Sequence, residues 1–465
     1  MSTSPGAVLS RLASIVGASH VTEDASSVQA YSIDGVAPVS AVRPGSIAEA
    51  AEVVKFAAAE RLALVASGAR TKLAMGLPPR EYDLALDLSR LDRISAYDPG
   101  DLTLSVEAGI PLSKIASALA QHAQFLPLAV PFENSATIGG TIASGIDSPL
   151  RQFFGTARDF VLGMEFITGD GSLAKSGGRV VKNVTGYDLH KLMIGAMGSL
   201  GVIAQVHFRT FPAPRSRRAF LASFDRSKQA WTLRQSIADS PLRPLTLDIL
   251  SPGVAQLFGS NSAAKRAPEP YNPKMLADRR WTLTSGFAGN AKALDRYAAD
   301  LRRMAEHAGA AEIATFGEEG IPGAFGRKRE FIPIALEASP ATVVLKVSAL
   351  PSRMNQVLSA AEKAAASRGI DWAAIIRGVG VAYAALLPKD RGAESLKAVL
   401  AATDEILAAT AAAVGNATIP WCPAEWKSRL KIWGLDRAEF AQMKKLKAFF
   451  DPAGVFSPGR FMGGI

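Results

Sequence analysis

The chain has 465 residues, more than one hydrophobic core usually organises, so we expect at least two domains. Hydrophobic residues make up 48% and charged residues 20%, which is typical of a globular protein and excludes a largely disordered one. The net charge of +10 comes from scattered Lys and Arg without a basic, aromatic stripe, so we expect an anionic cofactor or small carboxylate rather than a nucleic acid.

The start of the chain indicates where the protein is located, and its single cysteine limits the redox chemistry that its own side chains can perform. Residues 1–20 lack a basic segment followed by a long apolar one, so we expect a cytoplasmic protein without a cleaved signal. No apolar run approaches the roughly 18 residues of a membrane span. Cys422 alone cannot form an intrachain disulfide or supply the four ligands of an iron–sulfur cluster. Any redox chemistry must therefore use a bound organic cofactor.

The first elements lead to a candidate phosphate loop. A helix is expected near Ala7–Ile15, and the S-x-x-E pattern from Ser46 to Glu49 predicts the capped start of a second helix. A β-type run, Leu62–Ala66, then ends in Ser67, Gly68, Ala69, Arg70, Thr71 and Lys72, with Gly76 beyond. A strand followed by hydroxyls, glycines and two cations is a plausible diphosphate cradle, although an ordinary turn with solvated cations fits equally well.

The stretch from Pro131 to Phe211 dominates the first half of the chain. It follows expected strands at Leu84–Leu88 and Leu102–Gly109 and a helix beginning at Pro111. Its glycines lie between short apolar runs, a pattern that lets backbone come close to a large flat cofactor. Asp170-Gly171 predicts a hairpin turn, and Val202–Phe211 predicts a closing strand. Neither G-x-G-x-x-G nor a Walker loop is present, so a dinucleotide must be held in another way.

From about Arg215 the glycines thin out and strand-like and helix-like runs alternate. Strands are expected at 245–250, 281–285, 343–349, 372–376 and 379–387, and helices at 292–307, 352–368 and 396–413. This series predicts an antiparallel sheet with helices on one face. Residues 261–274 read as a loop, and a final helix precedes the turn that carries Arg460.

Several motifs in order resemble one family. They are DLSRLDRI, ATIGGTIASG, GTARDFVLG, SGGRVVKNVTGYDLHKL and DPAGVFSPGRF. They are similar to the flavin domain of the vanillyl-alcohol oxidase superfamily, the p-cresol methylhydroxylase (PCMH) type, and more closely to the FAD-binding subunit of bacterial glycolate oxidase. The resemblance implies an α+β fold with a two-lobed PCMH-type FAD-binding domain, a ferredoxin-like α/β cap and a C-terminal segment that returns to the FAD domain.

The resemblance also implies boundaries and a cofactor site. We expect an N-terminal helix in 1–30, the FAD-binding domain in 31–214 with lobes 31–98 and 99–214, the cap in 215–420 and the returning segment in 421–465. The implied FAD-binding residues are Ser67, Gly68, Ala69, Arg70, Thr71, Lys72, Gly76, Pro131, Thr137, Gly139, Gly140, Ser144, Gly145, Val202 and Ile203.

Some residues of the motifs have no assigned role. Arg151 either approaches the flavin or braces its lobe, and Arg158 is expected to brace the lobe by pairing with Asp159. Lys182, Asn183, Tyr187 and Asp188 are candidates for fold or subunit contacts.

Two departures from the family pattern concern histidine. The loop GARTKLAMG lacks the histidine of members that attach FAD covalently, so non-covalent FAD is expected. Catalytic relatives hold a metal with paired histidines, whereas this chain's five are dispersed, so no metal site is expected. Catalytic residues stay unknown, with Arg151, His190 and Arg377 as weak candidates; Lys346 and Tyr383 could join Arg377 in an unfamiliar arrangement.

Three functions remain open at this point. The resemblance favours a FAD-binding subunit that works with a catalytic flavin subunit and an iron–sulfur subunit on glycolate or another small 2-hydroxy acid. Such a complex would also provide any peripheral membrane association. The alternatives are a self-sufficient D-2-hydroxyacid (D-lactate-like) dehydrogenase and a non-catalytic scaffold. The intact glycine motifs argue against the scaffold. Glycine lowers the stability of the folded state, so it is disfavoured where no ligand or backbone segment has to come close.

Overall fold

The N-terminal lobe is built on a small sheet in the order β1-β2-β4-β3. The computed structural model describes residues 5–179, 186–267, 276 and 280–465. The strands of this sheet are β1 (Val21–Thr22), β2 (Ser40–Val42), β3 (Leu64–Ser67) and β4 (Leu84–Asp87). The helices α1 (Pro5–Val16) and α3 (Ile47–Glu60) contribute to the core beside it, and α2 (Ala25–Val28) connects β1 to β2. The predicted N-terminal capping of α3 is present, because Ser46 Oγ accepts a hydrogen bond from the Glu49 N–H at 3.1 Å.

The second lobe is a five-stranded antiparallel sheet in the order β5-β6-β10-β8-β9. Its strands are β5 (Ile94–Asp98), β6 (Thr103–Glu107), β8 (Val161–Ile167), β9 (Leu173–Gly177) and β10 (Val202–Arg209). Its helices are α4 (Leu112–Ala120), α5 (Ile138–Ser144), α6 (Arg151–Phe154), α7 (Ala157–Phe160) and α8 (His190–Met193). The strands β7 (Gln124–Phe125) and β11 (Phe211–Pro212) pair separately. Both lobes share one hydrophobic core, which fixes them as a unit.

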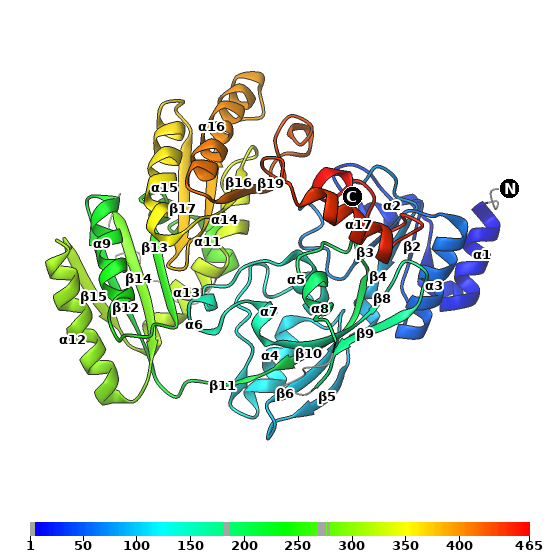
Figure 1. Ribbon diagram of the computed structural model, residues 1–465, viewed down its shortest axis with the longest axis horizontal. Coiled ribbons are helices and arrows are strands. Elements are labelled where there is room, and N and C mark those ends of the chain that lie inside the picture. The colour runs from blue at the N-terminus through cyan, green and yellow to red at the C-terminus, as the bar shows by residue number, and fades with distance from the viewer. Residues whose placement is uncertain (1–4, 180–185, 268–275, 277–279) are drawn as a thin grey trace.

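The cap is an eight-stranded antiparallel sheet in the order β15-β12-β14-β13-β17-β18-β16-β19. Its strands are β12 (Arg217–Phe224), β13 (Thr246–Leu250), β14 (Trp281–Ala288), β15 (Glu312–Phe316), β16 (Val343–Ser348), β17 (Asp371–Arg377), β18 (Val381–Leu387) and β19 (Asn416–Trp421). One face packs against α9 (Ser227–Ala238), α12 (Ala291–His307), α15 (Pro351–Ala366) and α16 (Ala393–Ala412) (Figure 1).

The prediction of helices on one face only was wrong. The other face carries α10 (Gly253–Phe258), α11 (Asn261–Arg266), α13 (Ile321–Arg329) and α14 (Phe331–Ala338). The strands of the cap are therefore buried on both faces. In β17, Ala374 and Ile376 pack in the core on one face of the sheet, whereas Ala373 and Ile375 pack in the core on the other. Such strands read as continuous apolar runs rather than alternating ones. The loop expected at 261–274 begins instead as α11, capped by Ser260; most of the rest lies outside the described residues.

The C-terminal segment returns to the first lobe, where its helix α17 (Phe440–Phe450) lies beside β3 (Figure 1). The backbone of Leu64 exchanges hydrogen bonds with the tail, donating to Val455 at 2.7 Å and accepting from Ser457 at 2.8 Å. The tail therefore extends the edge of the sheet immediately before the candidate phosphate loop.

Candidate functional site

A cleft lies between the loop that follows β3, the start of α5 and the turn that precedes β10. We call it the cofactor cleft. Twelve of the fifteen residues predicted to hold FAD line it: Ser67, Gly68, Ala69, Arg70, Thr71, Lys72, Thr137, Gly139, Gly140, Ser144, Val202 and Ile203. Three segments that are distant in the sequence, 67–72, 137–144 and 202–203, thus meet at one opening. Arg460 of the C-terminal tail also lines it.

Glycine allows these segments to approach so closely. The N–H of Gly139 donates to the Ala108 carbonyl at 2.8 Å, and a Cβ on Gly139 would lie only 2.7 Å from the Ala108 Cβ. A Cβ on Gly68 would overlap the Thr137 hydroxyl. These glycines are therefore needed for close backbone packing around the cofactor cleft, as well as for leaving room for a ligand.

Two polar side chains in the cleft have unused hydrogen-bonding capacity, and both fit an anionic dinucleotide. The Ser67 hydroxyl is buried without a partner among the described residues. Burial lowers the pKa of Lys72 to about 8. Its ammonium donates only to Thr71 Oγ1, at 3.2 Å, within the described part of the chain. A diphosphate would satisfy both groups, so the residues present fit FAD.

Arg70 has a bracing role that its sequence position did not reveal. Its guanidinium pairs with Asp87 at 3.1 Å and lies 4.6 Å from the centre of the Tyr31 ring. The Tyr31 hydroxyl donates to the same carboxylate at 2.7 Å, and burial together with this contact raises the pKa of Tyr31 to about 12. Tyr31 and Asp87 were not predicted, because only the fold brings them beside the loop.

A second cavity, the junction cavity, lies where the FAD domain meets the cap and the C-terminal segment. Its volume is about 470 Å³, and it shares Ser144 and Met197 with the cofactor cleft. Gly76 and Gly145, predicted to hold FAD, line this cavity rather than the cleft. Pro131 is buried and lines neither space.

Charged groups converge on the junction cavity. Asp147 is 6% exposed; one carboxylate oxygen lies 3.5 Å from Arg151, and the other is buried without a partner among the described residues. The backbone N–H of Asp147 donates to the Tyr383 hydroxyl at 3.2 Å. Lys346 approaches the Gly145 carbonyl at 3.4 Å. A buried carboxylate and four cationic side chains, Arg151, Arg158, Lys346 and Arg437, therefore line one space beside the cofactor cleft. Asp147 had no signal in the sequence.

The other weak catalytic candidates lie elsewhere. His190 is buried beside Ser176, with Nδ1 2.9 Å from the hydroxyl, and burial lowers its pKa. Arg377 forms a buried ion pair with Asp248 inside the cap. Neither lines the cleft or the junction cavity.

The expected bracing role of Arg158 holds with a different partner. Arg158 donates to the Lys191 carbonyl, whereas Asp159 accepts from the Thr156 backbone and hydroxyl at the start of α7. The predicted Arg158–Asp159 pair is not found among the described ion pairs.

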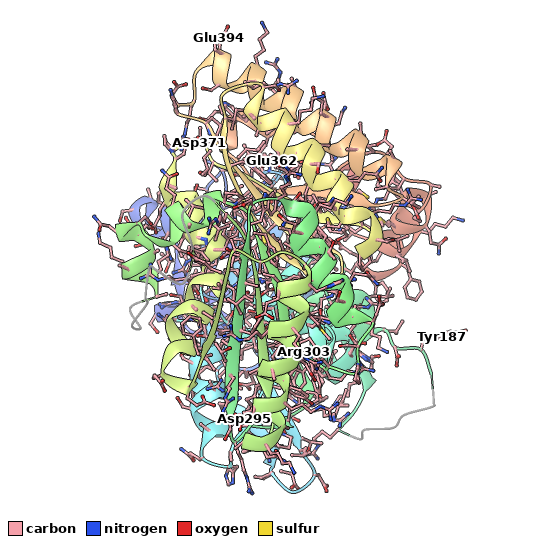
Figure 2. The ribbon with its side chains drawn as sticks, turned by 90° about the vertical axis from the view of Figure 1, so that its left-hand side faces the viewer. Tyr187, Asp295, Arg303, Glu362, Asp371 and Glu394 are labelled. Carbon is pink, nitrogen blue, oxygen red and sulfur yellow. The ribbon has the colours of Figure 1, made fainter. Side chains whose placement is uncertain are left out.

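The residues left without a role by the motif comparison remain without one. Lys182 and Asn183 lie outside the described residues. Tyr187 is 91% exposed and projects from the body of the molecule, and Asp188 pairs with Lys191 at 2.7 Å (Figure 2).

The described residues contain neither a cluster of metal ligands nor a membrane-crossing helix. Within that part of the chain, no group of three or more His, Cys, Asp or Glu side chains could hold a metal ion. None of its helices combines the length and apolar character needed to cross a membrane.

Comparison with known proteins gives two family matches. Residues 38–177 match the FAD binding domain, and residues 213–418 match the C-terminal domain of FAD linked oxidases. The first match contains the 67–72 loop and α5, and the second covers nearly all of the cap.

Curated relatives agree with these matches. Glycolate oxidase subunit GlcE of Escherichia coli is 34% identical over half of this chain and 65% of its own length. A D-2-hydroxyglutarate dehydrogenase of Xanthomonas citri is 36% identical over 40% of each chain. Glycolate oxidase subunit GlcD of Bacillus subtilis is 23% identical over 91% of this chain and 88% of its own. The chain thus matches less than two thirds of the length of the first two relatives.

Among solved structures, p-cresol methylhydroxylase with bound substrate superposes with a TM-score of 0.78. The alignment covers 98% of this chain and 96% of that one at 16% identity, which establishes a shared fold. The α+β, PCMH-type fold expected from the motifs is therefore confirmed. Residues 38–177 therefore form a FAD-binding domain, residues 213–418 form a C-terminal domain of the FAD-linked oxidase type, and the cofactor is FAD.

Proposed function

We propose that the chain is the FAD-binding subunit of a glycolate oxidase-type complex that oxidises glycolate, or a related small 2-hydroxy acid, to the 2-oxo acid. Its proposed partners are a catalytic flavin subunit and an iron–sulfur subunit. The names of the relatives GlcE and GlcD support this assignment. The observation that carries the proposal is that the cofactor cleft shares Ser144 and Met197 with a neighbouring cavity, which Asp147, Arg151 and Lys346 also line.

The proposed roles follow from the chemistry of these side chains. When bound, FAD supplies the two-electron acceptor for the oxidation. Lys346 and Arg151 would bind the substrate carboxylate through charge-assisted hydrogen bonds. The unpartnered oxygen of Asp147 would accept the proton of the substrate hydroxyl as the carbonyl forms. Non-covalent FAD would be held by the 67–72 loop and α5.

The junction cavity also favours a second candidate function. A self-sufficient D-2-hydroxyacid dehydrogenase needs a base beside the flavin, and the sequence showed no histidine pair for this role. Asp147 provides a buried carboxylate at the corresponding boundary between the FAD domain and the cap. The relative named D-2-hydroxyglutarate dehydrogenase supports this alternative. A scaffold without FAD is disfavoured by the cofactor cleft, because Ser67 and Lys72 have unused hydrogen-bonding capacity there.

The test is anaerobic reduction of the FAD-loaded chain. Flavin absorbance would be followed with glycolate, D-lactate and D-2-hydroxyglutarate, first alone and then with the candidate partner subunits. Bleaching only in the complex supports the accessory subunit, and bleaching of the isolated chain supports the self-sufficient dehydrogenase. FAD that stays oxidised under every condition contradicts both.

Asp147→Asn tests the proposed proton acceptor. The substitution keeps the shape of the side chain but removes its basicity, so flavin reduction should slow by about 10²–10⁴-fold. Bound FAD per chain should stay the same, because Asp147 lines the junction cavity and not the cofactor cleft. Asp101→Asn, at an exposed position in the turn before β6, is the matched control. Equal rates for both variants would remove Asp147 from the mechanism.

A further inference from the structure

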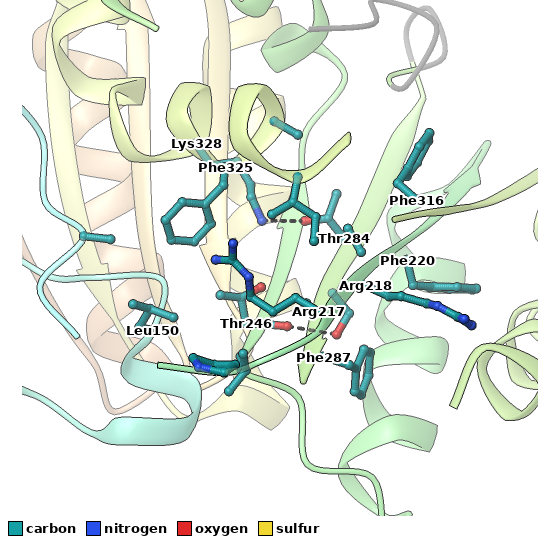
Figure 3. Close-up of a pocket in the computed structure, with 18 of the residues that line it drawn as sticks. Leu150, Arg217, Arg218, Phe220, Thr246, Thr284, Phe287, Phe316, Phe325 and Lys328 are labelled. Carbon is teal, nitrogen blue, oxygen red and sulfur yellow. Dashed lines mark hydrogen bonds between the residues drawn. The ribbon is translucent and has the colours of Figure 1, made fainter. Parts of the chain in front are cut away.

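A third, partly open cavity lies between the cap sheet, α13 and the second lobe (Figure 3). Its volume is about 400 Å³, within the roughly 300–1,000 Å³ of small-molecule sites. Among the residues that line these spaces, it has only Leu128 in common with the junction cavity and none in common with the cofactor cleft. We call it the cap cavity; neither FAD nor a small 2-hydroxy acid accounts for it.

The walls of the cap cavity are mainly apolar. Phenylalanines from six elements line the cavity together with leucines of the second lobe: Phe125, Phe220, Phe258, Phe287, Phe316, Phe325, Leu126 and Leu150. Because apolar surface gains free energy when it is removed from water, these walls favour an apolar occupant.

One wall of the cavity carries a buried cation. Lys328 of α13 lines the cavity and donates to Thr284 at 3.2 Å (Figure 3). It also donates to Asp248 at 2.9 Å. Arg377 pairs with the other oxygen of Asp248 at 3.0 Å. All three charged residues are buried, and no second carboxylate pairs with either cation among the described residues. The cluster therefore has two positive charges and one negative charge.

A carboxylate at Lys328 would neutralise this cluster. Buried charge is costly unless it is paired, so the excess positive charge favours an anion in the cavity. An ammonium has three N–H donors, of which two are used here. The Thr284 hydroxyl accepts from Lys328, which leaves its own O–H to donate. Arg217 and Arg218 add two further cations to the lining, each paired with a carboxylate, Glu318 at 3.1 Å and Asp295 at 2.6 Å.

We propose that the cap cavity binds a single-chain aliphatic carboxylate, with its head group at Lys328 and its chain against the phenylalanines. The buried cation selects the head group, and the apolar walls select the chain. This site is separate from the one proposed for the 2-hydroxy acid, and its test measures binding rather than turnover. Its outcome is therefore independent of the proposed function.

The experiment is calorimetric titration of the full-length, FAD-loaded chain with hexanoate, octanoate and decanoate, and with 1-decanol as the uncharged comparison. Each added methylene should tighten binding about three- to fourfold, as expected for apolar burial. Decanoate should bind at least tenfold more tightly than decanol. Equal affinity of the two would contradict charge recognition, and an absence of binding would overturn the proposal.

Two variants locate the site. Ala324→Phe, on α13 in the cavity wall, should weaken decanoate binding at least tenfold by filling the space. Ala408→Phe, at an exposed position of α16, is the matched control and should bind decanoate normally. Lys328→Met should reduce decanoate binding to the level of decanol while decanol still binds, which shows that the cavity remains intact. Unchanged decanoate binding in Ala324→Phe or Lys328→Met would place the ligand elsewhere.

Discussion

At the scale of single residues, Lys72 makes FAD binding depend on pH. Burial lowers the pKa of Lys72 to about 8 without the cofactor, and a neighbouring diphosphate would raise it again. FAD binding should therefore take up a proton above about pH 8. Affinity should be constant below that pH and fall by up to tenfold per pH unit above it. Titrations of the flavin-free chain with FAD between pH 7 and 9.5 measure this dependence.

Lys72→Met supplies the control for that dependence. The variant should bind FAD more weakly at pH 7, and its affinity should lose the decrease above pH 8. Lys397→Met, at an exposed position of α16, should behave as the wild type. A decrease that persists in Lys72→Met would assign the titration to another group.

At the scale of elements, the C-terminal tail holds the phosphate loop in place. Arg460 is 3% exposed, and its guanidinium donates to the carbonyls of Leu73, Met75 and Leu77. Arg460→Met would leave these buried acceptors unsatisfied, so the free energy of unfolding should fall by about 2–3 kcal/mol and FAD affinity should fall with it. Urea denaturation and FAD titration measure the two effects. Arg429→Met, at an exposed position, should change neither, and a stable Arg460→Met chain with normal affinity would refute the role of the tail.

The sequence predicted most elements whose signals are local. The Ser46–Glu49 pattern marked the start of α3, and the Asp170-Gly171 pair marked the β8–β9 hairpin. The glycines of 137–145 indicated a segment that lines the cofactor cleft, but not that residues 138–144 form the helix α5. The second helical layer of the cap was missed, because strands buried on both faces lack the alternation that would have revealed it.

At the scale of the whole molecule, a buried ion pair joins the segment after the cap to the first lobe. Lys427 Nζ lies 2.7 Å from Asp34, with side-chain exposures of 2% and 6%, and it also donates to the Ala74 carbonyl at 2.6 Å. Lys427→Met leaves the Asp34 carboxylate buried and unpaired, so the free energy of unfolding should fall by about 3–5 kcal/mol. Chemical denaturation measures this loss.

Lys431→Met is the matched control for that prediction. Its pair with Asp404 is about half exposed on both sides, so its loss should change stability by at most about 1 kcal/mol. Equal stability of the two variants would show that the buried pair does not secure the domains.

The junction and cap cavities could not have been predicted from the sequence. Asp147 and Tyr383 are 236 positions apart, and only the packing of the cap on the second lobe brings them together. Arg377 was singled out from the sequence, but its partner Asp248, and Lys328, which pairs with the same carboxylate, come from two other elements of the cap. Such groups have no local pattern, because their meeting depends on how whole layers pack.

The central claim is that the glycine-lined cleft holds FAD, and titration of the flavin-free chain with FAD tests it most directly. Gly140→Leu would fill the cleft without demanding a positive φ, whereas Gly6→Leu lies at an exposed position of α1. We expect one FAD per wild-type or Gly6→Leu chain, and at least a hundredfold weaker binding in a folded Gly140→Leu chain. Wild-type affinity in Gly140→Leu would contradict the account and place FAD elsewhere.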